Sequence, residues 1–440
     1  MRATDIWWCV ALTLLACGPS SPPDAGSEPD GGVTDGGADA VPMLDEALPC
    51  TPIPDTGVAE GDDLVRVTLS DPRAVCNDGT PAVMYVRRAA SPDQEDRWVF
   101  HLQGGGACGG PDCAARWCGR NSKMTTAGAP SSMGGVGLMR RGPENALGDA
   151  NQVFLYYCSS DNWAGRAPDA VVAAEGDVPR FRLHFQGDAI VDAALDALEE
   201  GASSDDGAVT LPALGGGGTA LWTGTSGGCQ GVANTADRFA ARMRALGVSP
   251  ALVCDANFGP TDSELPAGAA LDALLAGRRA RFDLTERYSN TNHDESCVAM
   301  HPTDPWRCEW SGYVLANHVT EAPLFLRMSL ADRAISDSYV AAGFDLDAFA
   351  TGVQSALSTA AAGGGLESTA RPISVYGPGC EQHVGLTNDD WFFSASMTAD
   401  GAEVTFHDAV VRWLAGDDVA VVDTAPPTIS TCAPVTDQTD

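Results

Sequence analysis

Short apolar runs recur along the chain between residues 97 and 377, and each is followed by a turn signal or a helical stretch. Runs of this length are typical of buried strands, and their alternation with helices indicates a mostly parallel sheet with helices on both faces. The six runs are RWVFHLQ, NQVFLYYC, TALWTG, PALVCDA, PLFLRMS and PISVYG. We therefore predict an α/β fold built on such a sheet.

Helical periodicity is visible in three segments, and the first two of them stop at glycine. They are AIVDAALDALEEG, ANTADRFAARMRALG and FHDAVVRWLAG. Between Gly259 and Ala322 the pattern loosens into a polar stretch that contains Trp306 and Trp310. Because this stretch is too long for an ordinary connection, we expect a cap or insert at about 259–322 within one folded domain over 50–435.

The charge balance excludes several classes of partner. The chain has 26 Lys and Arg residues against 59 Asp and Glu residues, which gives a formal net charge of −33. A chain this acidic lacks the phosphate attraction that nucleic-acid binding requires, so we expect no nucleic-acid partner and no attraction to anionic lipid surfaces. The one lysine, Lys123, does not follow a glycine-rich turn, which excludes a GxxxxGK phosphate loop and leaves hardly any candidate for a Schiff base.

The first residues have the features of an export signal. Arg2 precedes an apolar run from Ile6 to Ala16, which is much shorter than the ~20 residues that a membrane-spanning helix needs. The run ends in LLAC, which resembles the lipobox of bacterial lipoproteins, where the cysteine, here Cys17, is lipidated; a plain signal peptide is the alternative.

This start leads to expectations for the N-terminal segments and for the location of the protein. We expect a signal peptide over 1–16 and a lipidated, disordered acidic linker over 17–49, because the linker is rich in Ser, Pro, Asp, Gly and Ala. The protein is then exported and attached to the bacterial outer membrane or cell surface only through its lipid anchor.

Cysteine usage agrees with export. Of the 14 cysteines, one lies in the expected signal peptide and one would carry the lipid, which leaves an even number for disulfides. Cys108, Cys113 and Cys118 are spaced by five residues and lack the CxxC pattern of a zinc site, so we expect disulfides rather than a metal. Cys297 and Cys308 are near enough in sequence to clip a local loop.

The run TALWTG leads into a motif that can carry chemistry. It continues through Gly224, Ser226 and Gly228 as GxSxG and then into a helical segment. In a strand, sharp turn and helix of this kind, the small residues allow a turn tight enough to expose the serine hydroxyl as a nucleophile. A glycine-rich connection without chemistry is the alternative.

A serine nucleophile needs an imidazole to take its proton and an acid to orient that imidazole. In α/β-hydrolases both follow the serine, the acid first, on loops after later strands. Asp332 comes just after PLFLRMS, and His383 lies in the loop after PISVYG, whereas His407 opens a helical segment. We therefore predict a triad of Ser226, Asp332 and His383, with Asp337 as the fallback acid; Asp332 could instead be an ordinary acid at a helix N-terminus.

Acyl transfer also needs N–H donors for the oxyanion that develops on the substrate carbonyl. The N–H of Gly227 follows the nucleophile, and Gly104, Gly105 and Gly106 follow the early strand-like run RWVFHLQ. Backbone without side chains can approach a substrate closely, so we expect Gly104, Gly105 and Gly227 to form the oxyanion hole. A flexible hairpin is the alternative for the glycine-rich segment.

Six sequence blocks stand in order between Val75 and His383: VCNDGTPAVMYVRRA, WVFHLQGGGACGG, YCSSDNWAG, GTSGG, PLFLRMSLAD and CEQH. In the same order they resemble the C(N/L)DGSPAGYY, WLxxLEGGGWC, YCSSDxWxG, GxSAGG, PLFxxxSxYD and CxxH blocks of the pectin acetylesterase and Notum family of serine carboxylesterases. The resemblance implies an α/β-hydrolase-like fold and assigns the nucleophile, acid and base to Ser226, Asp332 and His383. This chemistry needs no metal and no organic cofactor.

The chain departs from those blocks at three positions: Gln103 replaces Glu, Ala107 replaces Trp, and Gly227 replaces the Ala of SAGG. Pocket shape and acyl size therefore do not transfer from the resemblance. Asp161 and Trp163 keep the pattern, and we expect them, together with Gly106, to contact the substrate at the entrance of the site. A structural turn with one buried aromatic is the alternative for the first two.

The resemblance implies an exported carboxylic ester hydrolase that acts through an acyl-Ser226 intermediate. We expect it to remove acetyl groups from an extracellular polysaccharide, so that the partner is an acylated glycan or another ester. A polyanion such as pectin would be repelled by so acidic a chain, and a neutral acetylated glycan is at least as good a candidate. The alternatives are an esterase for longer acyl chains, with a deep apolar pocket, and a non-catalytic surface lipoprotein that binds glycans.

Overall fold

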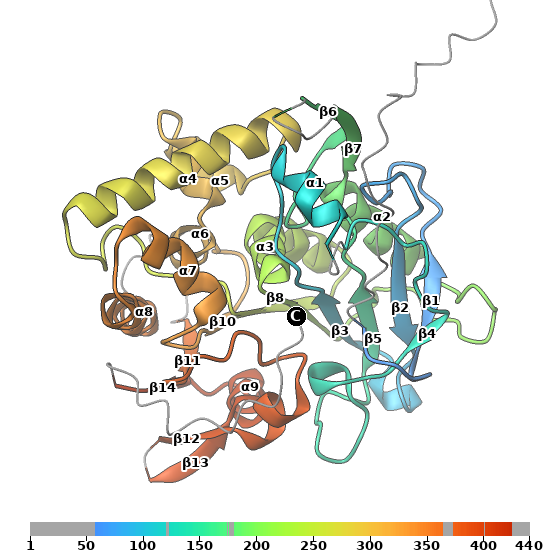
Figure 1. The fold of residues 1–440 in the computed structure, drawn as a ribbon. Coiled ribbons are helices and arrows are strands. Elements are labelled where there is room, and N and C mark those ends of the chain that lie inside the picture. Colours follow the sequence, from blue (N-terminus) through green and yellow to red (C-terminus); the bar gives the residue numbers. More distant parts are fainter. Residues whose placement is uncertain are drawn as a thin grey trace, which may run out of the picture. The chain divides into compact units, whose positions relative to one another are not determined.

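The structure is a computed structural model that describes residues 58–119, 123–173, 175, 180–363, 373–399 and 401–424 (Figure 1). These residues all belong to one unit of the chain, Leu44–Asp440. The expected signal peptide over 1–16 and linker over 17–49 lie outside the described residues, as do the two ends of the expected domain. Within the described ranges, no helix combines the length and the apolar character needed to cross a membrane.

Ten of the described strands form one sheet, in the order β14-β11-β10-β9-β8-β3-β5-β2-β1-β4. The strands from β14 to β5 run parallel, and β2, β1 and β4 continue the sheet in antiparallel pairs. The strands are β1 Leu64–Thr68, β2 Val83–Arg87, β3 Arg97–Leu102, β4 Ser132–Met133, β5 Asn151–Leu155, β8 Thr219–Thr225, β9 Ser249–Asp255, β10 Leu324–Arg327, β11 Ser374–Gly377 and β14 Ala420–Val422. All six predicted strand runs are confirmed, as neighbours in the sheet.

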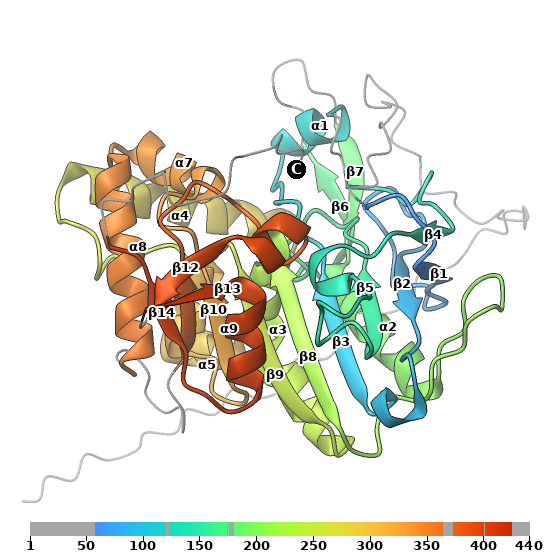
Figure 2. The same cartoon turned by 90° about the horizontal axis from the view of Figure 1, so that it is seen from below.

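Helices cover the sheet, and two small antiparallel pairs lie beside it. The long helix α3 packs against β8 and β9, while α9 lies on the opposite face (Figures 1 and 2). The helices are α1 Asp112–Trp117, α2 Gly187–Glu200, α3 Gly227–Ala245, α4 Ala269–Tyr288, α5 Glu295–Met300, α6 Ser311–Asn317, α7 Arg333–Ala342, α8 Leu346–Ala361 and α9 Phe406–Leu414; the small pairs are β6 Ala167–Val172 with β7 Phe181–Phe185 and β12 Ser396–Ala399 with β13 Ala402–Thr405. The predicted α/β fold with helices on both faces is confirmed.

The polar stretch over 259–322 is mostly helical. It contains α4, α5, a short 3-10 helix at Pro305–Glu309 and α6. Only Leu274, Thr285 and Tyr288 of α4 are buried, so the helix turns most of its surface to solvent. This explains why the segment showed no apolar periodicity in the sequence.

Four disulfides lie within the described residues, and they confirm the expectation of disulfide bonding. They are Cys76–Cys158, Cys108–Cys113, Cys229–Cys254 and Cys297–Cys308. Cys108 and Cys113 thus bond to each other, and Cys297–Cys308 clips a local loop as predicted. Not every cysteine that the even count made available for disulfides is bonded. Cys380, which is buried, is the one free cysteine of the described part of the chain.

Candidate active site

Ser226 lies at the sharp turn between β8 and α3, with φ 52° and ψ −118°. The turn needs glycine on both sides of the serine. A Cβ atom on Gly224 would lie 2.2 Å from the carbonyl oxygen of Gly228, and a Cβ on Gly228 would lie 2.0 Å from that of Leu102. Real Cβ atoms do not approach backbone so closely, so the GxSxG motif is dictated by packing as well as by chemistry.

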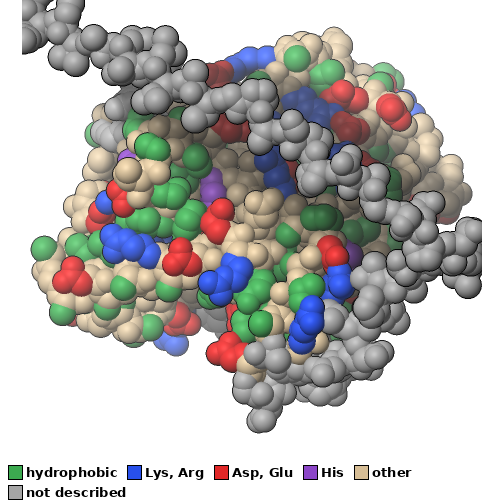
Figure 3. Space-filling model, turned by 90° about the horizontal axis from the view of Figure 1, so that it is seen from above, with side chains coloured by type: hydrophobic (Ala, Val, Ile, Leu, Met, Phe, Trp, Pro, Cys, Tyr) green, Lys and Arg blue, Asp and Glu red, His purple; other side chains and the backbone are tan. Residues whose placement is uncertain are grey.

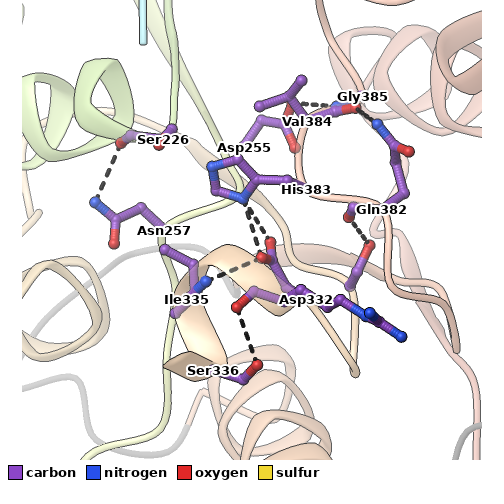
Figure 4. A network of polar contacts seen from close by, with 12 residues as sticks. Ser226, Asp255, Asn257, Asp332, Ile335, Ser336, Gln382, His383, Val384 and Gly385 are labelled. Atoms are coloured by element: carbon purple, nitrogen blue, oxygen red, sulfur yellow. Dashed lines mark hydrogen bonds and ion pairs between the residues drawn. The ribbon is translucent and has the colours of Figure 1, made fainter. Parts of the chain in front are cut away.

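His383 lies in the loop after β11 and faces Asp332. Its Nδ1 is 2.9 Å and 3.0 Å from the two carboxylate oxygens of Asp332, and both side chains are buried. Figure 4 shows the ring between Asp332 and Ser226, with its second nitrogen on the Ser226 side. Because Nδ1–H donates to the carboxylate, Nε2 is left as the atom that can accept a proton.

Asp332 makes two contacts with its carboxylate. It is the N-cap of α7, where Oδ1 accepts a hydrogen bond from the N–H of Ile335 at 3.1 Å, and the same carboxylate holds His383. The fallback acid, Asp337, is exposed on α7. The other histidine, His407, lies at the start of α9 and accepts a hydrogen bond from the N–H of Ala146.

A buried ion pair that the sequence analysis did not find connects the serine turn with the histidine loop. Asp255, at the end of β9, accepts the N–H of Ser226 on its backbone oxygen at 2.8 Å. Its carboxylate accepts the N–H groups of Gly385 and Leu386 at 2.7 and 2.8 Å and pairs with Arg327 at 3.0 Å. One buried residue therefore fixes the positions of both the nucleophile and the base loop.

Arg327, at the end of β10, holds the same loop by its backbone oxygens. Its guanidinium donates to the carbonyl oxygens of Gln382 and His383 and to the hydroxyl of Ser329. Burial opposes the charge of Arg327, but the carboxylate of Asp255 raises its pKa above the ordinary value. A charged residue inside a strand read as buried, here in PALVCDA and PLFLRMS, is the signal that could have revealed this pair.

The glycine-rich segment after β3 lies directly against the serine turn. A Cβ on Gly104 would be 2.7 Å from the carbonyl oxygen of Thr225, and the nitrogen of Gly106 is 3.1 Å from where Gly227 would carry its Cβ. Gly105 faces the other way, towards Lys123, whose Nζ donates to the carbonyl oxygen of Gly104 at 3.3 Å. The structure thus brings Gly106, which we had assigned to substrate contact, next to the expected donor Gly227.

The segment YCSSDNWAG packs against this glycine-rich loop. Trp163 is fully buried and donates from Nε1 to the carbonyl oxygen of Gln103 at 3.0 Å. Asp161 is buried and accepts hydrogen bonds from the hydroxyl of Ser159 and the N–H groups of Trp163 and Gly187. Burial raises the pKa of Asp161 to about 6 against these hydrogen bonds. Neither side chain lies at the surface, which favours the structural alternative for both residues over substrate contact.

Strained backbone gathers in these segments. Seven described residues other than glycine have a positive φ: Lys123, Ser160, Asn162, Trp163, Ser226, Ala256 and Asn290. Ser226 forms the serine turn, Ser160, Asn162 and Trp163 belong to the segment that contacts Gly227, Lys123 contacts the glycine-rich loop, and Ala256 directly follows Asp255. Such strain costs about 1–3 kcal/mol per residue and persists mainly where function requires the geometry.

The mostly parallel sheet, the serine turn, and the imidazole with its carboxylate place this protein among those with an α/β-hydrolase-like fold. The model of one protein family, "Pectinacetylesterase", matches residues 60–433. The chain therefore belongs to the pectinacetylesterase family.

Curated relatives include two proteins named "Palmitoleoyl-protein carboxylesterase NOTUM". The one from Drosophila melanogaster is 28% identical over 279 residues, which are 62% of this chain and 38% of that protein. The one from Mus musculus is 30% identical over 190 residues, which are 42% of this chain and 33% of that protein. The matched segments thus span well under half of these relatives.

Solved structures agree on the fold. A crystal structure of the "Wnt deacylase Notum from Drosophila" matches with a TM-score of 0.64 at 24% identity and covers 82% of this chain and 96% of that chain.

Another relative, from Danio rerio, is 34% identical over 103 residues, which are 23% of this chain and 72% of that protein, and is named "Inactive palmitoleoyl-protein carboxylesterase notum1b". One relative is thus named as inactive, so similarity alone does not establish activity.

Proposed function

We propose that this protein is a serine carboxylesterase that works through an acyl-Ser226 intermediate. The observation that carries the proposal is the pair of His383 and Asp332 behind a serine on a strained turn. The N–H groups of Gly104, Gly105 and Gly106 donate no hydrogen bond within the described residues, which supports their assignment as donors to the oxyanion.

Acylation begins when Ser226 Oγ attacks the ester carbonyl carbon and gives its proton to Nε2 of His383. The carbonyl oxygen becomes an oxyanion, which the N–H of Gly227 and those of the glycine-rich loop stabilise. The tetrahedral intermediate then collapses, the bond from carbon to the alcohol oxygen breaks, and His383 returns the proton to the departing alkoxide.

Deacylation repeats these steps with water as the nucleophile. His383 takes a proton from the water, the hydroxide attacks the acyl carbon, and the bond to Ser226 Oγ breaks as Oγ regains a proton. The acid leaves and the free enzyme is restored. Asp332 stays ionised throughout and stabilises the imidazolium that forms in each half-reaction.

The substrate that we propose is an acetyl ester on an extracellular polysaccharide. The name of the family supports acetyl, and the described cavities of about 330 and 210 Å³ are lined by neither Ser226 nor His383, so neither of them supplies an acyl tunnel behind the serine. The disulfides suit an oxidising, extracellular environment. Anchoring through a lipid on Cys17 is part of the proposal.

Charge favours a neutral glycan over a polyanion. The chain carries −33. On the face seen in Figure 3, acidic and basic side chains are interspersed among the described residues, without a continuous basic surface there. A polyanionic chain would gain little long-range attraction from such a surface.

An ester panel tests the proposed function. We expect hydrolysis of 4-nitrophenyl esters with the highest kcat/KM at acetyl and a fall of at least about tenfold by octanoyl, because a site fitted to acetyl has no room for a longer chain. Initial rates from acetyl to palmitoyl measure this. An optimum at octanoyl or longer supports the long-chain esterase suggested by the relatives' names, and no turnover on any ester, with retained glycan binding, supports the non-catalytic alternative.

The acid assignment has its own test on the same helix. Asp332→Asn is expected to lower kcat by about 10³- to 10⁴-fold, because the amide can donate to Nδ1 and so favour the wrong imidazole tautomer, and because a neutral amide no longer stabilises the imidazolium. Asp337→Asn, on the exposed face of α7, is the matched control and should keep wild-type kcat. Equal losses in the two variants, or none in Asp332→Asn, would overturn the assignment.

A further inference from the structure

The residue after the nucleophile has an unusual neighbour. Gly227 stands where the blocks of the resembling family have alanine, and the space of that missing methyl group is occupied. Asn162 Oδ1 lies 2.9 Å from the position of a Cβ on Gly227, and the nitrogen of Gly106 lies 3.1 Å from it. Real Cβ atoms essentially never come within 3.0 Å of another heavy atom, so an alanine at 227 would require the Asn162 carboxamide to move from its present position.

The backbone of Asn162 is held in this place by its own hydrogen bond and by its buried neighbours. Its N–H donates to the hydroxyl of Tyr157 at 2.6 Å, and both of its chain neighbours, Asp161 and Trp163, are buried. Its φ of 55° is left-handed, which asparagine tolerates better than most residues. Asn162 is half-buried, and its Oδ1 lies next to the residue that follows Ser226.

We propose that the Asn162 carboxamide is part of the oxyanion site and donates a third hydrogen bond to the substrate's carbonyl oxygen. Its Oδ1 and the nitrogen of Gly106 both lie close to one point, the position of a Cβ on Gly227, and half a turn about the last side-chain torsion exchanges Oδ1 for the donor Nδ2. Side-chain amides serve as oxyanion donors in other hydrolases. The inference deepens the proposed function and rests on it.

Two substitutions distinguish the contribution of the Asn162 side-chain amide from that of its left-handed backbone. Asn162→Gly removes the donor while the left-handed φ becomes easier, and Asn162→Asp keeps the shape but has no N–H donor. We expect both to lower kcat for 4-nitrophenyl acetate by about 100-fold with KM nearly unchanged, because the hydrogen bond forms mainly in the transition state. Asn290→Gly is the matched control, since Asn290 is also left-handed but exposed and should keep wild-type kcat.

A second measurement tests whether a methyl group at position 227 acts by displacing the Asn162 side chain. Gly227→Ala is expected to lower kcat/KM in the wild-type background, because the new methyl group displaces Asn162, and to lower it much less in an Asn162→Gly background. Thermal unfolding of each variant shows that it is folded. Wild-type kcat in Asn162→Gly, or equal effects of Gly227→Ala in both backgrounds, would overturn the inference.

The outcome is distinguishable from a failure of the proposed function. If the wild-type protein hydrolyses no ester, or if Ser226→Ala is as active as the wild type in the same assay, the proposed function as a serine esterase acting through Ser226 is refuted. If wild-type turnover depends on Ser226 but is indifferent to Asn162, only the third donor is refuted.

Discussion

Ser226→Ala is expected to reduce kcat/KM for acetyl esters by at least about 10⁴-fold, leaving only what the oxyanion donors provide. The loss follows because the proposed nucleophile is the hydroxyl of Ser226 at the turn between β8 and α3, and Figure 4 shows the second ring nitrogen of His383 on the Ser226 side. Steady-state hydrolysis of 4-nitrophenyl acetate measures the effect. Ser338→Ala, which removes an exposed hydroxyl from α7, is the control and should match the wild type.

The triad also predicts how losses combine. His383→Ala should cost about as much as Ser226→Ala, and the double variant should be no worse than either single one, because the two groups act as a unit. Multiplicative losses would contradict a shared proton transfer. So would retained activity in either single variant.

The second large effect concerns the stability of the fold. Asp255→Leu is expected to reduce the free energy of unfolding by about 3–5 kcal/mol, because it leaves the Arg327 guanidinium charged and buried without its partner. The N–H groups of Gly385 and Leu386 lose their acceptor at the same time. Denaturant unfolding followed by circular dichroism measures the change.

The double variant Asp255→Leu with Arg327→Met separates stability from positioning. Replacing both charges by apolar groups should restore much of the stability, since buried pairs gain little over apolar packing. Activity should stay low, because the loop that carries His383 has lost both tethers. Arg333→Met breaks an exposed ion pair with Glu381 and should leave the unfolding midpoint unchanged. Full recovery of kcat in the double variant would refute the positioning role.

Much of the fold was predictable because the central strands are buried on both faces. Such strands read as continuous apolar runs, and all six were recognised as sheet strands. The antiparallel strands β1, β2 and β4 were missed. β1 alternates only partly between buried and half-buried residues, β4 has two residues, and β2 ends in the buried charge of Arg87, so none of them presents a long apolar run.

The candidate site was predictable where chemistry restricts residue types. Ser226 needs glycines around it, and the order of acid and base along the chain points to Asp332 and His383, which the structure places in contact. Contacts between distant segments leave no comparable pattern of residue types in the sequence. The tie between Asp255 and the loop after His383, the contact of Asn162 with Gly227, and the burial of Asp161 and Trp163 all depend on how loops pack.

Covalent labelling tests the central claim most directly. The wild-type protein is treated with a fluorophosphonate that reacts with activated serines, digested, and analysed by mass spectrometry, with His383→Ala treated in parallel. The account predicts one labelled peptide, with the adduct on Ser226, and loss of that label in His383→Ala. An unlabelled Ser226 in the folded wild-type protein, or labelling that does not depend on His383, would contradict it.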